Sequence, residues 1–497
     1  MQQENAQKVG VIAKLHKFFG ATDLTKGCIW KTILKFTIPI IISYLLQQFY
    51  ILTDAIICGQ TLSADEVAGV NDTSPLIFIF MQFAFGCTAG FCVYTSKKAG
   101  ANDGEGLKKS FATQIILCSV ITVVLTVLAV FLIKPLLAIV NVTPKNKAVY
   151  KAAYTYCFVI FLGIISQVFY NFIISILRSI GDSVTPLFFL IGSTALNIGL
   201  DLLFIKVLHW GVAGAAVATV ITQLLCTVCC FVYSFVRYKQ LRLKKHHFKL
   251  ALVEVWEHLK LGLPLGLQFS VLAIGLIVMQ AETVRFDILP NGLMVENNPA
   301  QNGTAAANQL IRFTMAPFNA LGTAMVSFNA QNLGAKDYER VKKGTNQGLF
   351  ILLITCIVCM SIGLLLTING TYQRIFLSAD KISVKSLKLG TTFLYIDIGL
   401  YIGLGGLIVL RSCVQGIGLS NWTLVAGVGE LLARVLVCKF LPPLVNGGAT
   451  DAYASLGAYI ALSFGDPIAW FIALFILLYP YYKHIVKKDY NYLLKNK

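Results

Sequence analysis

The chain has 497 residues, of which 57% are hydrophobic and only 13% are Asp, Glu, Lys or Arg. Soluble globular proteins carry about 25% charged residues, so this composition indicates a polytopic membrane protein and leaves little room for a soluble domain. The net charge of +18 would suit nucleic acid only on a basic soluble domain, and no segment of that kind stands out. Most of the thirteen cysteines fall in apolar stretches, where Cys behaves as a small apolar residue.

About twenty apolar residues are needed to cross a bilayer as a helix. A basic N-terminal segment (1–35) is followed by six such stretches, near 36–58, 73–96, 110–133, 152–177, 183–205 and 211–236. After a basic linker (237–260) come six more, near 261–281, 303–333, 344–369, 386–410, 419–441 and 464–482, and then a basic tail (483–497). We therefore predict an all-α membrane protein with twelve transmembrane helices, in an N-lobe (36–236) and a C-lobe (261–482).

The positions of Lys and Arg predict the orientation of these spans, because cytoplasmic loops are enriched in both. Placing the N-terminus inside puts most of the 41 basic residues on the inner side. Both termini are then cytoplasmic. The lipid bilayer is the expected partner, with basic loops near anionic headgroups, and we expect the protein in the plasma membrane.

Short motifs recur in the same order in the two halves. Pro39 and Pro264 open spans one and seven, Gly-Ala-Asn-Asp (100–103) and Gly-Ala-Lys-Asp (334–337) follow spans two and eight, and Arg178-Ser179 and Arg411-Ser412 end spans four and ten. The offsets are nearly constant. Six spans per half give both halves the same orientation, so the lobes are expected to be related by a pseudo-two-fold axis along the membrane normal. Such repeats usually place a substrate site between the halves.

Polar residues inside the spans are the candidate functional groups, since they are costly in a bilayer and usually face a cavity. Asp54 lies in span one, on the helix face that also carries Gln47 and Cys58. Asn197 and Asp201 are four residues apart in span five and share a face. These residues could bind a cation, or they could serve only to hold helices together.

Together these motifs resemble the multidrug and toxic compound extrusion (MATE) family. The resemblance covers residues 30–485 and also includes the stretches Arg178–Pro186, Asn197–Asp201, Gly211–Thr219 and Gln331–Ala335. It implies two six-helix lobes in a V and cation-coupled export of organic, often cationic, drugs or metabolites. It also implies no cofactor and no enzymatic activity.

The family's N-lobe cation site corresponds to Asp54, Asn197, Asp201 and Thr219. Their oxygen atoms could hold Na⁺, or the carboxylates could carry H⁺, and the sequence leaves both coupling ions open. No other metal site is expected. In the C-lobe, Asp397 resembles an acidic position of some members, and it is equally open to a structural role. An acidic position that some members have after the span-seven proline is Ala273 here, which suggests coupling mainly through the N-lobe.

Three further charged groups in the C-lobe have no certain role. Glu282 and Arg285 are expected to pair near the outer interface, and Glu430 and Arg434 to pair within span eleven. Arg312 in span eight needs a partner that the sequence does not identify. The loop from Asp287 to Asn302 is predicted to lack ordered structure.

Apolar and polar side chains of the spans suggest a substrate cavity, which we expect to include Tyr44, Gln47, Met279 and Phe313. An alternative is a flippase or exporter of a lipid-linked or other endogenous metabolite, which would need several arginines in the cavity. Arg312 and Arg434 are the candidates for that role. An enzyme is disfavoured because all six His lie in loops or at the ends of spans. A monomer is expected.

Overall fold

The computed structural model describes residues 21–487 except 141, 379 and 380. The rest of the predicted N-terminal segment and tail (1–20 and 488–497) lies outside the described residues. Within the described part the chain is almost wholly helical, and one isolated β-bridge joins Ile288 to Met294.

The N-terminal half contains α2 (Ile29–Thr61), α3 (Ala64–Gly100), α4 (Gly104–Ile139), α5 (Lys147–Leu162), α6 (Ile164–Ser179), α7 (Val184–Asp201) and α8 (Gly211–Arg237). The C-terminal half contains α9 (Leu252–Arg285), α10 (Pro299–Gly334), α11 (Tyr338–Thr367), α12 (Thr371–Phe376), α13 (Val384–Gly399), α14 (Tyr401–Gly416), α15 (Ser420–Asn446), α16 (Leu456–Ser463) and α17 (Gly465–Tyr481). Short 3₁₀ and π turns join some of them, including a π turn after α7 (Leu202–Val207).

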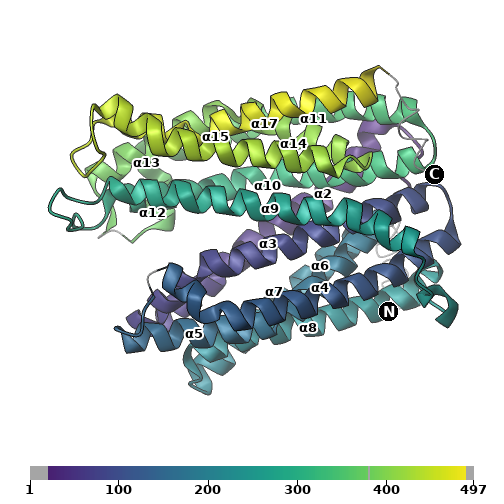
Figure 1. Ribbon diagram of the computed structural model, residues 1–497, viewed down its shortest axis with the longest axis horizontal. Helices are drawn as coiled ribbons and strands as arrows, with labels where there is room; N and C mark the ends of the chain where they lie inside the picture. The colour runs from purple at the N-terminus through teal and green to yellow at the C-terminus, as the bar shows by residue number, and fades with distance from the viewer. Residues whose placement is uncertain (1–20, 141, 379–380, 488–497) are drawn as a thin grey trace, which may run out of the picture.

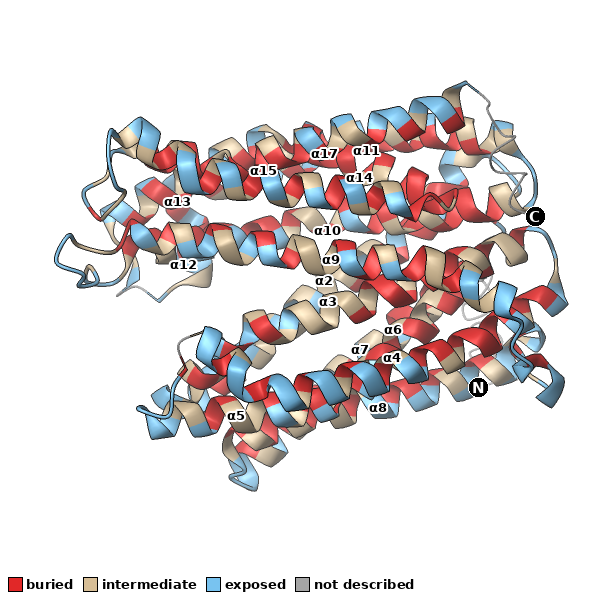
Figure 2. Ribbon diagram, in the orientation of Figure 1, coloured by how far each residue is buried: buried red, intermediate tan, exposed pale blue. Residues whose placement is uncertain are grey.

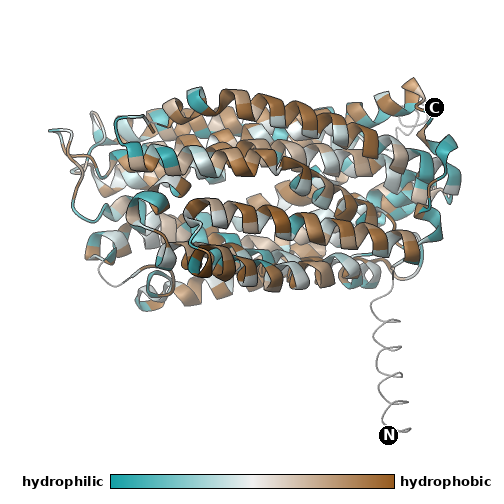
Figure 3. Cartoon of the chain, turned by 90° about the horizontal axis from the view of Figure 1, so that it is seen from below, coloured by the Kyte–Doolittle hydropathy of each residue, from teal (hydrophilic) through white to brown (hydrophobic). Residues whose placement is uncertain are grey.

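Eight helices are long and apolar enough to cross a membrane, and two bent pairs, α5 with α6 (45°) and α13 with α14 (50°), raise the number to ten. The two remaining predicted spans coincide with α10 and α15, which are long but carry more polar residues. The bends follow directly from short breaks at Gly163 and Leu400. Hydrophobic residues surround the middle of the molecule and hydrophilic ones gather at its two ends (Figure 3), which fits a membrane-spanning bundle.

Helices α3–α8 and α9–α17 form two groups that lie one above the other in Figure 1, and α2 runs between them. Its first half, with Ile33, Phe36 and Ile40, is buried in the core of the C-terminal helices, and α2 also contacts α7. Contacts between the two halves of the chain are made mainly by α3 with α9 and α10, and by α2 with α10. The pseudo-two-fold symmetry relates the α3–α9 contact to the α2–α10 contact, because span one (α2) corresponds to span seven (α9) and span two (α3) to span eight (α10). Buried residues concentrate on the inner sides of each group and exposed ones on the outer helices (Figure 2).

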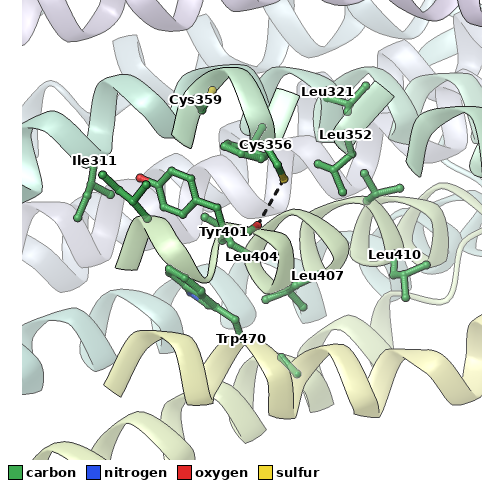
Figure 4. Close-up of a cluster of buried hydrophobic side chains, with 14 of the residues drawn as sticks. Ile311, Leu321, Leu352, Cys356, Cys359, Tyr401, Leu404, Leu407, Leu410 and Trp470 are labelled. Carbon is green, nitrogen blue, oxygen red and sulfur yellow. Dashed lines mark hydrogen bonds between the residues drawn. The ribbon is translucent and has the colours of Figure 1, made fainter. Parts of the chain in front are cut away.

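The core of the C-terminal group is shown in Figure 4, where Tyr401 and Trp470 pack among leucine and isoleucine side chains. The Cys356 thiol donates a hydrogen bond to the Tyr401 carbonyl at 3.6 Å. Cys356 and Cys359 are therefore part of the apolar core, as their sequence context predicts.

The repeated Gly-Ala-x-Asp motif forms the same corner twice. Gly100 ends α3 against the backbone of Gln331, where a Cβ atom would collide. Asn102 is left-handed (φ 54°), and the Asp103 carboxylate caps α4 by accepting the Gly106 N–H at 2.8 Å. This bond holds the pKa of Asp103 below its usual range. The second corner has Gly334 against Lys97, Lys336 at φ 60°, and Asp337 accepting the Arg340 N–H at 2.9 Å.

The predicted correspondence between Arg178-Ser179 and Arg411-Ser412 is wrong by about one helical turn. Helix α6 ends at Ser179, but α14 continues to Gly416. The left-handed glycines that follow are Gly181 (φ 88°) and Gly418 (φ 91°), which are 237 residues apart. When the two halves are aligned on these glycines, Gln415 corresponds to Arg178. The two dipeptides resemble each other because both helices contain Arg-Ser, but the dipeptide ends α6 and lies about one turn before the end of α14.

Hydrogen bonds between the two groups gather at the end of the molecule where these corners lie. Lys97 Nζ donates to the Ile417 carbonyl at 3.4 Å, and Gln331 Nε2 donates to the Ser179 carbonyl at 2.7 Å. Lys97 and Gln331 are themselves equivalent, 234 residues apart. Each half thus reaches a turn of the other half, and the two halves are held together at this end.

The loop between α9 and α10 is ordered, contrary to prediction. Asp287 is fully buried, and its carboxylate accepts the backbone N–H groups of Ala300 and Gln301 at 2.8 Å. It therefore stabilises the start of α10 through the unpaired N–H groups of the first turn.

Candidate functional site

Asp54 lies on α2, and its side chain is turned towards α7. The Asp54 and Asp201 carboxyl groups are near enough to share a hydrogen bond when one of them carries a proton. Atom Oδ1 of Asp54 is buried and has no hydrogen-bond partner among the described residues. No arginine or lysine of the described chain forms an ion pair with either group; each ion pair present lies elsewhere, from Lys26–Asp23 to Arg434–Asp466. The structure therefore brings together the two predicted acidic residues and leaves them without a protein counter-ion.

Asn197 and Asp201 come from the last turns of α7. Their side chains are almost completely buried, at 1% and 0% exposure. Both carboxylate oxygens of Asp201 and the amide nitrogen of Asn197 lack a partner within the described part of the chain. Asp201 is the last residue before the π turn Leu202–Val207, a kind of irregularity that often occurs at functional sites.

Four more side chains surround these acids. Thr219 on α8 lies beside the Tyr50 hydroxyl, and its own hydroxyl donates to the Ala215 carbonyl at 3.2 Å. The Asp54 carboxylate lies close enough to Tyr50 and Tyr156 to act on both electrostatically, and Tyr170 lies close to Tyr50. The three tyrosines were not predicted, because an isolated Tyr in an apolar span gives little signal. The one available sequence signal concerns Tyr50, which lies four residues before Asp54 and therefore shares its helix face.

Carboxylate, amide and hydroxyl oxygens thus converge from α2, α7 and α8. These are hard ligands of the type that bind Na⁺ and other hard cations. Buried carboxylates without a counter-ion also favour proton binding, because a protonated carboxyl avoids the cost of a buried charge. The cluster, which we call the N-lobe acidic cluster (Asp54, Asn197, Asp201 and Thr219), is chemically suited to either ion.

The acidic groups of the C-terminal half are arranged differently. Arg434 on α15 donates to the Asp466 carboxylate of α17 at 2.6 Å and pairs with Glu430 at 3.3 Å. Arg411 on α14 also binds Glu430. The predicted Glu430–Arg434 pair is present, but it belongs to a network of four charges on three helices. Two of its members were missed because they are distant in sequence.

Asp397 is buried at the end of α13, directly before the break with α14. Neither of its carboxylate oxygens has a hydrogen-bond partner in the described residues. It lies within electrostatic reach of Asp466 and Arg434. Asp397 therefore adjoins the Arg434 network, and the arginine charge acts on it even without a direct bond.

The predicted cavity residues do not share one environment. Gln47 is exposed on α2, while Phe313 is half-buried, with its ring 5.3 Å from that of Phe49. Tyr44 is half-buried, and its hydroxyl lies 3.3 Å from that of Thr323. Met279 is only 5% exposed and belongs to the C-terminal core. The expectation that Met279 lines a cavity is therefore wrong for this conformation, because its side chain packs inward.

Two of the remaining charged groups also have clear positions. Glu282 and Arg285 form the predicted pair, at 2.9 Å. Arg312 is exposed on α10, and it has no hydrogen bond or ion pair within the described ranges. Arg434, predicted as a second cavity arginine, is buried in its ion-pair network and is not available to line a cavity.

One group of metal-ligating residues occurs outside the spans, where Glu105 meets His246 and His247. His247 Nδ1 accepts the Lys244 N–H at 2.7 Å, so Nε2 carries the proton that is donated to Glu105 at 2.9 Å. Lys108 binds the other Glu105 oxygen at 2.7 Å. The Glu105 carboxylate is thus already neutralised and the His247 ligand atom is protonated, so this group ties the linker to α4 and is a poor cation site.

Comparison with known proteins gives consistent relatives. The MatE family model matches residues 39–203 and 302–439. In Bacillus subtilis (strain 168), the probable multidrug resistance protein YoeA is 24% identical over 93% of this chain and 96% of its own length. The probable multidrug resistance protein YpnP of the same organism is 28% identical over 65% of this chain and 69% of its own. A solved outward-facing multidrug resistance MATE family transporter has the same fold, with a TM-score of 0.79, 20% identity and coverage of 96% and 99%.

Proposed function

This chain belongs to the MatE family of multidrug efflux transporters, and from that premise we propose that it is a cation-coupled antiporter. In this proposal Na⁺ or H⁺ moves inward and a small organic compound moves outward by alternating access. The coupling ion binds at the N-lobe acidic cluster. We further propose that the protein acts as a monomer in the plasma membrane.

The observation that carries this proposal is the absence of a counter-ion at Asp54 and Asp201 within the described structure. A buried carboxylate without a partner is expensive, and proteins retain such groups chiefly where a ligand or proton neutralises them during function. A purely structural acid would be expected to resemble Glu430, which has two arginine partners.

The transport cycle follows from how charge affects α2. Helix α2 contacts both α7 of its own lobe and α10 of the other lobe. Binding of a cation between Asp54 and Asp201 removes the repulsion between them and favours closer packing of α2 on α7. Because α2 also contacts α10, this shift changes the surface between the lobes and weakens substrate binding. The ion and the substrate thus prefer different states, which is the requirement for exchange.

The orientation of the protein in the membrane is also part of the proposal. The end at which the lobes are held together carries the basic linker and the corners at 101–103 and 335–337. The excess of Lys and Arg on cytoplasmic loops supports assigning this end to the cytoplasm. The lobes then open to the outside, and both termini are cytoplasmic.

Dye transport in inverted membrane vesicles tests the function. Ethidium uptake should be driven by an imposed Na⁺ gradient or by an imposed proton gradient, and the gradient that works identifies the coupling ion. Asp54→Asn should reach normal membrane levels and lose gradient-driven uptake. Asp65→Asn, on an exposed acid in the first turn of α3, is the matched control and should retain uptake. Full uptake by Asp54→Asn would rule out the proposed ion site.

A further inference from the structure

Arg312 is a cation in the middle of a membrane-spanning helix with no partner of its own. It lies thirteen residues after the start of the 36-residue helix α10. Its side chain is exposed, and no acidic side chain in the described structure pairs with it. An arginine facing lipid at this depth would cost at least about 2.5–3.5 kcal/mol. Arg312 therefore faces water, not hydrocarbon.

Four polar residues lie on one side of α10 and are exposed or half-buried. We call them the α10 polar face: Asn308, Arg312, Asn319 and Thr323. Met315, which lies between Arg312 and Asn319, packs against the C-terminal core. The opposite side of the helix, with Leu310 and Leu321, is buried in the C-terminal core. Polar residues on one face explain why α10 is less apolar than the other spans.

This face lies on the side of α10 that meets the N-lobe. Helix α10 is a central helix, which packs against α2 and α3 of the N-lobe and against α11, α13 and α14 of the C-lobe. An exposed face on a helix with neighbours in both lobes is a candidate for the surface that meets a transported compound. The contacts of Phe313 with Phe49 and of Thr323 with Tyr44 show that α2 lies along the edge of the same face.

A second arginine lies near the far end of this face. The Arg178 guanidinium lies 5.9 Å from the centre of the Tyr44 ring, and Tyr44 contacts Thr323. Arg178 Nε is buried and has no hydrogen-bond partner in the part of the chain described. Thr323 is eleven residues from Arg312, or about 16 Å along the helix. Two arginines without acidic partners thus mark the two ends of one face.

No acidic side chain of the described residues forms an ion pair with either arginine, and the acids of the spans have other partners or roles. Asp54 and Asp201 face each other inside the N-lobe, and the coupling ion neutralises them in the proposed cycle. Glu282 is paired with Arg285, and Glu430 with Arg411 and Arg434. A guanidinium presents a planar fork of N–H donors that fits a carboxylate better than any neutral group. The neighbouring residue Phe313 packs its ring 5.3 Å from that of Phe49, which is 54% exposed and offers an apolar surface for an aromatic body.

We propose that the transported compounds include aromatic organic anions, whose carboxylate binds to Arg312. This inference rests on the proposed transport function and adds a substrate class to the organic cations for which ethidium is the probe. The substrate's anionic group binds to the C-lobe and the coupling cation binds to the N-lobe, so the two do not compete for one site.

Binding of two dyes with the same ring system and opposite charge tests the substrate class. Fluorescein carries a carboxylate, and rhodamine 6G is a cationic ester. Fluorescence polarisation with the purified full-length protein in detergent, without any gradient, should show that fluorescein binds. Arg312→Gln should weaken fluorescein binding about tenfold or more, as expected for loss of a charge-assisted hydrogen-bond pair, and leave rhodamine 6G binding unchanged.

Two further variants complete this test. Arg312→Lys keeps the charge but loses the planar fork, so it should lose less affinity than Arg312→Gln, and it carries the test if the glutamine variant does not fold. Arg374→Gln, at an exposed arginine on α12, is the matched control and should bind as the wild type does. Equal fluorescein binding by wild type and Arg312→Gln, or binding of rhodamine 6G alone by the wild type, would overturn the inference. Failure of gradient-driven transport with intact fluorescein binding would instead contradict only the coupling mechanism.

Discussion

The N-terminal and C-terminal lobes both contain acidic side chains within their membrane-spanning helices, but Glu430 and Asp466 of the C-terminal lobe are paired with arginine, whereas Asp54 and Asp201 of the N-terminal lobe are not. When the repeats are aligned on Gly181 and Gly418, Asn197 of α7 corresponds to Arg434 of α15. When they are aligned on the helix prolines Pro39 and Pro264, Asp54 of α2 corresponds to Met279 of α9. In one lobe the site contains unpaired acids. In the other the same region contains an arginine and a buried methionine.

This difference shows how one duplicated scaffold can serve two purposes. In the C-lobe, Arg434 provides a permanent positive charge for Glu430 and Asp466, so these groups have no need of an ion from solution. In the N-lobe no fixed cation is present at Asp54 and Asp201 within the described residues, so a mobile one can bind and leave. The arginine pairs suit a structural role for the C-lobe network, whereas the unpaired acids suit the exchangeable ion site that we propose for the N-lobe acidic cluster.

The strongest test of this contrast is removal of the C-lobe arginine. Arg434→Met should lower the free energy of unfolding by about 3–5 kcal/mol, because it leaves buried acids without their partner. The effect should appear as a large fall in the melting temperature in detergent. Arg374→Met, at an exposed position, serves as the control and should melt near the wild-type temperature. A wild-type melting temperature for Arg434→Met would mean that the network is not structural.

The opposite outcome is expected in the N-lobe. Asp201→Asn removes a buried charge that has no partner, so the melting temperature should stay the same or rise. Gradient-driven dye uptake should nevertheless be lost, because an amide cannot take up a proton and holds a cation less strongly. A fall in melting temperature as large as that of Arg434→Met would show that the two lobes use their acids alike.

The smallest effect should occur where the lobes remain symmetric. Gly100→Ala and Gly334→Ala each place a methyl group against the backbone of the other lobe, which should cost about 1–3 kcal/mol of packing at the closed end. Hydrogen exchange of segments 97–104 and 331–338 should increase to a similar extent in both variants. Gly104→Ala is the control, because nothing lies within 4 Å of its added methyl group. Unequal responses would show that the two corners differ in function.

Much of the fold could be predicted because apolar stretches and repeated motifs are local signals. The acids of the N-lobe were also visible, since Asp54 and Asp201 stand out in apolar sequence. What could not be predicted depends on contacts between distant residues. Asp466 lies 32 residues after Arg434, and Arg411 lies 19 before Glu430, so neither partnership has a sequence signature. The loop after α9 was predicted to be irregular because it is rich in Asn, Pro and Gly. The burial of Asp287, which binds the start of α10, could not be read from that composition.

Gly100 and Gly334 lie where α3 and α10 cross, at the end of the molecule that carries the basic linker, and this contact limits how the two lobes can move. Because Gly100 and Gly334 lie directly against backbone of the opposite lobe, the helices there cannot approach further and can only rotate about the contact. Helix α10 extends about 54 Å from this crossing. A rotation of about 10° at such a fulcrum moves the far tip by about 9 Å, given that length. In the proposed alternating-access cycle, a small rotation at the fulcrum would thus be enough to admit an organic molecule at the far end.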